Sequence, residues 1–243
     1  MRSFSMLSLS PRRWFCVLLS GFALCASSAQ AQPPAAGAAD VAAPDADAAV
    51  ARATAERGLA EYVQRKQQAG ADTPAAGLAL DVADLQALSG ASIAYGFPVY
   101  TIAPQDLVDG RGDLRSLARP TGTWRFAVRV DGRPVGLVTV ARIAGQWQPV
   151  SFGGAGLAAE VDALMAAHAN AERSNVRFIR IFQAQSDLFE VVSPDGQAAY
   201  GLLRSARASL GAGTGEAADG LRQSRDLAGP LRAAVMKNMA AAR

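Results

Sequence analysis

The sequence predicts an α+β fold whose antiparallel sheet of five or six strands is built on a central meander at about 124–152. Three observations support this prediction. Apolar and polar residues alternate with a period of two over 124–130, which is typical of a strand with one buried face. The dipeptide Asp131-Gly132 follows, and it favours a two-residue type I′ hairpin turn. An apolar stripe at helical spacing over about 156–171 then indicates a helix that packs on one face of the sheet.

Turn chemistry also predicts the remainder of the meander. A second strand is expected over 133–142 and a third over 146–152, with a turn near Ala144-Gly145 between them. In the register set by a two-residue first turn, Phe126 lies opposite Leu137 on the face that forms the core.

Other patterns predict elements on both sides of the meander. Helices are expected over 51–69, from about 81 to 88 and over 104–108. The stretch 93–102 is predicted to be an edge segment, because Pro98 cannot donate a hydrogen bond to a central ladder. Beyond the meander, further strands are expected over 177–183, 187–193 and 197–203, followed by a helical turn over 204–210.

Residues 1–31 have the features of a secretory signal peptide. Arg12 and Arg13 precede an apolar stretch at 14–26, and Ala29-x-Ala31 fits a cleavage site. We therefore expect cleavage near Ala31 and a periplasmic or secreted location. The arginine pair resembles the core of a twin-arginine signal, so the general secretory and twin-arginine routes both stay open. The apolar stretch is shorter than the roughly 20 residues of a membrane-spanning helix, and none is expected later.

Composition divides the rest of the chain into four parts. Residues 32–50 are rich in Ala, Pro and Asp and are predicted to be a disordered linker. A single α+β domain is expected over 51–210, followed by a glycine-rich linker at 211–220. Residues 221–243 read as a basic amphipathic C-terminal tail. Such a tail can contact a membrane surface weakly, bind a partner, or pack on its own domain.

Cysteine usage and charge exclude several classes of function. Cys16 and Cys25 both fall in the predicted signal, so no disulfide, thiolate nucleophile or cysteine-based metal site is expected after cleavage. Three of the 24 basic residues and none of the 21 acidic ones lie in the signal, so the charges balance in the mature chain. This balance argues against a nucleic-acid partner, which requires a concentrated positive field.

The sequence contains no recognisable catalytic, metal or cofactor motif. There is no nucleophile elbow and no Ser-x-x-Lys pair. His168 is the single histidine, and it continues the apolar stripe of its helix, so we expect a structural role for it. The three aspartates at 106, 109 and 113 share one loop but do not match the spacing of a calcium-binding EF-hand. We therefore expect no catalytic residue, no metal and no cofactor.

The outer face of the meander is the candidate partner-binding surface. Arg125, Arg129, Arg142 and Trp147 share the parity that the predicted register turns away from the core. Arg142 is expected to face Trp147 across the second hairpin, and a guanidinium over an indole contributes about 0.5–1 kcal/mol when exposed. Tryptophan and arginine are common anchors of interfaces. The alternatives are an ordinary solvated face and a face covered by the 51–69 helix.

These observations together predict an exported bacterial envelope protein that acts as a non-catalytic binding, sensing or accessory module with a protein partner in the envelope. One alternative is a small periplasmic hydrolase that uses Asp or Glu side chains. Another is a chaperone-like or inhibitor-like domain that adds a partner strand to an edge of its sheet.

Overall fold

A single mixed sheet with helices on both faces forms the fold. The computed structural model describes residues 44–69, 77–110, 112–211 and 220–241. The predicted signal peptide at 1–31 lies outside these ranges, as do most of the linkers at 32–50 and 211–220. The end of the first linker is not coil, because helix α1 (Pro44–Gln68) already begins there. None of the described helices is long and apolar enough to cross a membrane.

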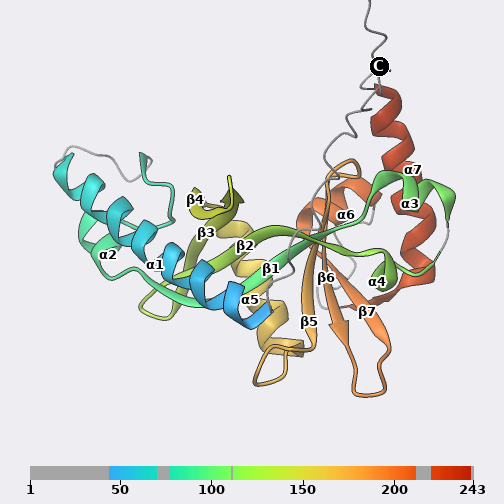
Figure 1. Cartoon of the computed structure of the whole chain (residues 1–243), viewed down its shortest axis with the longest axis horizontal. Helices are drawn as coiled ribbons and strands as arrows, with labels where there is room; N and C mark the ends of the chain where they lie inside the picture. Colours follow the sequence, from blue (N-terminus) through green and yellow to red (C-terminus); the bar gives the residue numbers. More distant parts are fainter. Residues whose placement is uncertain (1–43, 70–76, 111, 212–219, 242–243) are drawn as a thin grey trace, which may run out of the picture. The chain divides into compact units, whose positions relative to one another are not determined.

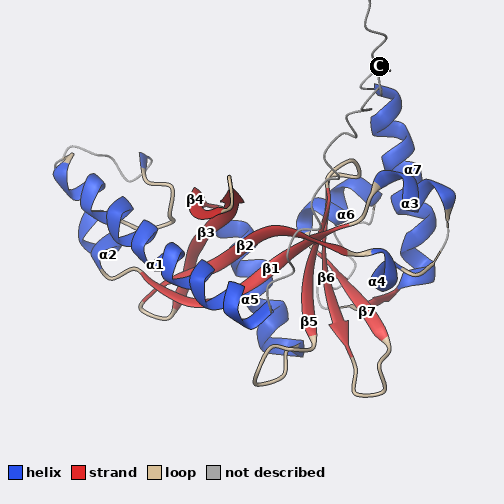
Figure 2. Cartoon of the chain, viewed as in Figure 1, coloured by secondary structure: helices blue, strands red, loops and turns tan. Residues whose placement is uncertain are grey.

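Among the described residues, the sheet has eight strands in the order β4-β3-β2-β1-β5-β6-β7-β8, more than the five or six predicted. Figure 1 labels β1 to β7. Its strands are β1 (Ser92–Thr101), β2 (Arg119–Val130), β3 (Arg133–Ile143), β4 (Gln146–Gly153), β5 (Val176–Ile181), β6 (Ser186–Val192), β7 (Ala198–Leu202) and β8 (Arg222–Gln223). Only β1 and β5 pair in parallel, and every other neighbouring pair is antiparallel. Two antiparallel meanders are therefore joined through their first strands (Figure 2).

Strand β1 is central, and the prediction of an edge segment over 93–102 was wrong. It pairs with β2 on one side and with β5 on the other. The parallel ladder to β5 is confined to Val99 and Tyr100, so Pro98 lies just before it. A proline is tolerated in this central strand because the second ladder begins one residue later.

The predicted meander is confirmed, but its register is displaced by one residue. Asp131 and Gly132 have φ angles of 51° and 79°, as a type I′ turn requires. The ladder then shifts between Val128 and Arg129, whose partners are Gly136 and Pro134, so Val135 is an extra residue on β3. Because of this bulge, Phe126 lies opposite Val138 and not opposite Leu137.

Both faces of the first meander are covered by helices. Helix α1 buries Ala55, Leu59 and Tyr62 on the face that carries Phe126 and Val138. Helix α2 (Leu85–Ser89) packs beside α1. Helix α5 (Ala155–His168) covers the opposite face, where its buried side chains meet those of β1, β2, β3, β5 and β6. The meander therefore has two core faces instead of the single one predicted.

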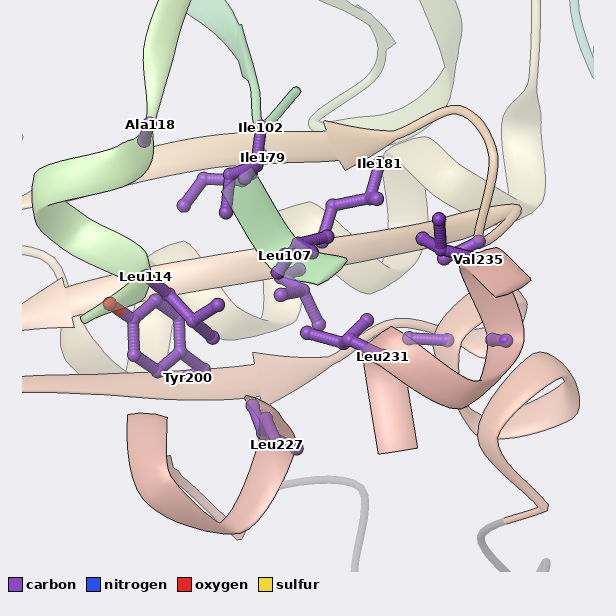
Figure 3. Packing of buried hydrophobic residues seen from close by; sticks show 14 of the residues in the cluster. Ile102, Leu107, Leu114, Ala118, Ile179, Ile181, Tyr200, Leu227, Leu231 and Val235 are labelled. Atoms are coloured by element: carbon purple, nitrogen blue, oxygen red, sulfur yellow. The ribbon is translucent and has the colours of Figure 1, made fainter. Parts of the chain in front are cut away.

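A third hydrophobic cluster lies over the second meander. It is closed by α3 (Pro104–Asp109), α4 (Leu114–Leu117), α6 (Arg204–Leu210) and α7 (Ser224–Ala241). Leu227, Leu231 and Val235 of α7 belong to this cluster, and Figure 3 shows Leu231 next to Leu107 and Val235 on the side of Ile181. These α7 side chains come from the segment interpreted in the sequence as a tail, so its apolar stripe packs on its own domain.

Candidate functional site

The predicted pair Arg142 and Trp147 lies against helix α1. The two residues are direct cross-strand partners, and the guanidinium carbon is 5.3 Å from the centre of the indole ring. Arg142 Nη2 also donates to Asp47 Oδ1 of α1 at 2.7 Å. The indole Nε1 is buried without a hydrogen-bond partner among the residues that the structure describes. These contacts fasten α1 to the second hairpin, so this pair lies under a helix.

Arg125 and Arg129 lie on the opposite face of the sheet, under α5. The guanidinium carbon of Arg125 is 4.9 Å from the centre of the Phe178 ring, and burial lowers the pKa of Arg125. The structure therefore separates the four predicted residues into two pairs. The extra residue Val135 is the physical reason, since it reverses the parity of β3 relative to that of β2.

Arg129 opens onto a cavity of about 250 Å³ at the C-terminal end of α5. We call this cavity the Tyr95 pocket; its lining residues are Tyr95, Arg129, Asp162, Met165, Ala166, Ala169, Asn170, Ala171 and Arg173. The side chains come from β1, from β2, from α5 and from the loop that follows α5. Two arginines and one aspartate give the lining a formal charge of +1.

Asp162 organises the polar side of the pocket. Its Oδ1 accepts a hydrogen bond from the Tyr95 hydroxyl at 3.1 Å and another from Arg129 Nη2 at 2.5 Å. Within the described ranges, no hydrogen bond reaches the other carboxylate oxygen, Oδ2, and the side chain is 21% exposed. One oxygen of Asp162 is therefore fully engaged, while the other can accept a hydrogen bond from a ligand.

Two guanidinium groups lie around the Tyr95 ring. Their carbon atoms are 5.9 Å from the ring centre for Arg129 and 5.0 Å for Arg173. Arg129 Nε is buried and has no hydrogen-bond partner among the described residues. Arg173 is exposed, and it forms no ion pair with any carboxylate in the part of the chain that the structure describes. The pocket thus offers donors that the protein itself does not satisfy.

The loop that carries Arg173 is braced by its own side chains. Ser174 N donates to Asn170 Oδ1 at 2.9 Å, and Asn170 N donates to Asn175 Oδ1 at 2.8 Å. Asn175 Nδ2 in turn donates to the carbonyl of His168 at 3.0 Å. Arg173 has a φ of 54°, a left-handed conformation that is uncommon for residues other than glycine. These hydrogen bonds hold an unfavourable backbone conformation and so fix where the Arg173 side chain begins.

The Tyr95 hydroxyl is a hydrogen-bond donor and not a base. Burial and the neighbouring Asp162 carboxylate raise its pKa well above the ordinary value for tyrosine. A proton that stays on this oxygen across the physiological range suits the fixed hydrogen bond to Asp162. The arrangement can therefore bind and orient a charged group, whereas it is poorly suited to remove a proton.

The buried carboxylates elsewhere in the fold are engaged with protein partners. Asp187 is held by Arg180 through both oxygens at 2.8 Å, and Ser205 Oγ donates to it at 2.9 Å. Glu190 is held by Arg177 and Tyr200. No group of three or more His, Cys, Asp or Glu side chains is arranged to hold a metal ion within the described ranges.

Sequence reasoning identified Arg129 but missed Tyr95, Asp162 and Arg173. Asp162 is 67 residues from Tyr95 and 33 from Arg129, so no local spacing links them. The alternation over 124–130 was the one available indication. It places Arg129 on the face of β2 opposite to Phe126, which is the face that α5 covers.

Comparisons with known proteins found no significant match to a protein-family model, to a curated protein or to a solved structure. The geometry of the Tyr95 pocket is therefore the basis on which a function is proposed.

Proposed function

We propose that the protein is an exported, non-catalytic binding module of the bacterial envelope whose Tyr95 pocket binds an oxyanion of its ligand, a carboxylate or a phosphate group. One observation carries the proposal: Arg129 and Arg173 converge on the same aromatic ring at the wall of a cavity. We infer export from residues 1–31, which have the features of a secretory signal peptide.

The chemistry of the two arginines supports an anionic ligand. A guanidinium presents planar, permanently charged donors that match the geometry of carboxylate and phosphate oxygens. Arg129 is partly neutralised by Asp162, whereas the exposed Arg173 has no carboxylate partner among the described residues. A hydrogen bond to a charged group contributes about 1.5–3 kcal/mol, so one such contact has a measurable effect on affinity.

A hydrolase that uses Asp or Glu side chains has weaker support. The pocket contains one carboxylate, Asp162, and its Oδ1 already accepts two hydrogen bonds. Tyr95 keeps its proton, as its raised pKa indicates. The buried carboxylates Asp187 and Glu190 are held in ion pairs with arginines. Neither the pocket nor these buried pairs resembles the two opposed carboxylates of a general acid and a general base.

Strand addition also has weaker support, because neither edge of the described sheet is a good template. Edge strand β4 contains Pro149, and its ladder to β3 shifts at Val150. Proline and bulges are two of the devices by which proteins prevent pairing at sheet edges. The opposite edge, β8, has only two residues.

The proposal is tested by titrating the purified, nitrogen-15-labelled protein with sodium pentanoate and with inorganic phosphate at constant ionic strength. We expect saturable shifts of the Nε–H signals of Arg129 and Arg173 with at least one of the two anions. Arg173→Gln should weaken binding about tenfold, because it removes one charged donor.

Arg225→Ala is the matched control, since Arg225 is an exposed arginine of α7 that does not line the pocket. This variant should bind both anions as the wild type does. Shifts that fail to saturate, or equal losses in Arg173→Gln and Arg225→Ala, would contradict the proposal. In that case the contacts of Asp162 serve only to fasten α5 to the sheet.

A further inference from the structure

We infer that the ligand of the Tyr95 pocket is a zwitterion of the amino-acid type, in which an ammonium group lies beside the carboxylate. This inference rests on the proposed function and narrows the class of ligand. The pocket combines two guanidinium groups with one carboxylate oxygen that accepts no hydrogen bond from the described residues. It therefore presents both signs of charge to the group that enters it.

Asp162 has one oxygen, Oδ2, that accepts no hydrogen bond from the described residues, and this favours a ligand with a positive charge. Asp162 lines the cavity, and Oδ1 takes both of its hydrogen bonds, from Tyr95 and from Arg129. A simple anion bound by the arginines would approach the unsatisfied Oδ2 of like charge, which disfavours it. A ligand that carries a charged donor next to its oxyanion removes this repulsion and satisfies Oδ2 instead.

The Asp162 carboxylate and the backbone of Arg173 are both held in place before a ligand binds. Tyr95 and Arg129 hold the Asp162 carboxylate from two strands, and the braced loop holds the backbone of Arg173. Recognition of two opposite charges on one small group requires such preorganised partners, since each partner that must be ordered on binding weakens affinity.

The cavity is small, which favours a small ligand. Its volume of about 250 Å³ lies below the range of roughly 300–1,000 Å³ that is typical of pockets for larger organic ligands. The rest of the lining is mostly apolar and consists of Met165, Ala166, Ala169, Ala171 and one amide residue, Asn170. A small amino acid, with its charged head group at Asp162 and Arg173 and a short apolar side chain, matches both the volume and the lining.

L-norvaline and two analogues that each lack one of its charged groups test the inference on the wild-type protein. The analogues are pentanoate, which lacks the ammonium group, and butylamine, which lacks the carboxylate. We expect norvaline to bind about tenfold more tightly than pentanoate, because it adds a charged hydrogen bond. Butylamine should bind more weakly than norvaline, because it loses the contacts with both arginines.

Asp162→Asn tests the role of the negative charge in the pocket. We expect it to reverse the order of affinity between norvaline and pentanoate. The variant keeps an oxygen that can accept from Tyr95 and Arg129 but loses the negative charge. Norvaline should bind several-fold more weakly to it than to the wild type, and pentanoate several-fold more tightly. Arg173→Gln should weaken norvaline and pentanoate alike, whereas butylamine should bind at least as tightly as to the wild type, because a like charge is removed from the pocket.

The outcomes distinguish the inference from the proposed function. If norvaline and pentanoate bind the wild type equally and Asp162→Asn strengthens both, the zwitterion inference is overturned while the oxyanion site stands. If pentanoate, phosphate and norvaline all fail to bind the wild type, both are overturned. The wild-type comparison requires no variant, so a misfolded variant cannot obscure the result.

Discussion

Arg177 and Glu190 face each other across the hairpin of β5 and β6, and the Glu190 side chain has no exposed surface. The Arg177 guanidinium donates to both carboxylate oxygens, with Nη2 at 2.9 Å from Oε1, and its Nε contacts Oε2. The Tyr200 hydroxyl also donates to Oε1 at 3.1 Å. A fully buried carboxylate is thus stable only because its charge and its lone pairs are satisfied by these two side chains.

Arg177→Ala should therefore lower the free energy of unfolding by about 3–5 kcal/mol, because it leaves the charge of Glu190 buried and unpaired. Urea unfolding followed by circular dichroism measures the change. Arg133→Ala is the matched control, since it breaks an ion pair with Asp81 whose side chains are 57% and 64% exposed. The control should cost at most about 1 kcal/mol, and equal losses in the two variants would contradict the argument.

Tyr200 gives the protein a predictable loss of stability in alkali. Burial and the Glu190 carboxylate raise the pKa of Tyr200 above the value of about 10 that is usual for tyrosine. When the pH exceeds the usual pKa of tyrosine, Tyr200 loses its proton in the unfolded chain but keeps it in the folded chain. Unfolding is therefore favoured as the pH rises toward the pKa of Tyr200 in the folded chain. We expect the urea midpoint to fall between about pH 9 and about pH 11, and the fall to be smaller in Tyr200→Phe. An identical slope in the two proteins would refute this role of Tyr200.

Gly96 is required because an aromatic ring occupies the place of a side chain. A Cβ atom at this position would lie 2.3 Å from Cε1 of Phe126, which is itself buried. Gly96→Ala should lower the free energy of unfolding by about 1–3 kcal/mol, as overpacking does. Gly156→Ala is the control, because a Cβ at this position of helix α5 meets only Arg204 Nη1, at 4.0 Å. The control should stabilise the protein by up to about 1 kcal/mol, and a neutral Gly96→Ala would show that Phe126 can move aside.

The meander was predictable because its signals are local. The alternation over 124–130 and the Asp131-Gly132 turn each involve neighbouring residues, and the structure confirms both. The bulge at Val135 was not predictable in this way, since one extra residue leaves the alternation on either side intact. That single residue decided which side chains share a face, and so it separated Arg142 from Arg125.

Long-range pairing was the other feature that could not be predicted. The parallel ladder joins Val99 to Phe178, and no property of either stretch indicates the other.

Helix α7 contributes one face to the core of the fold, and two substitutions on it test this packing. Leu231 is fully buried between α7 and the second meander, whereas Met236 of the same helix is 54% exposed. Leu231→Ala should cost about 2–5 kcal/mol, as large-to-small changes in a packed core do, and Met236→Ala should change stability by less than about 0.5 kcal/mol. Urea unfolding of the two variants measures the difference. A tail that only touches a membrane or a partner would give equal, small effects, because neither leucine nor methionine would then leave a cavity in the fold.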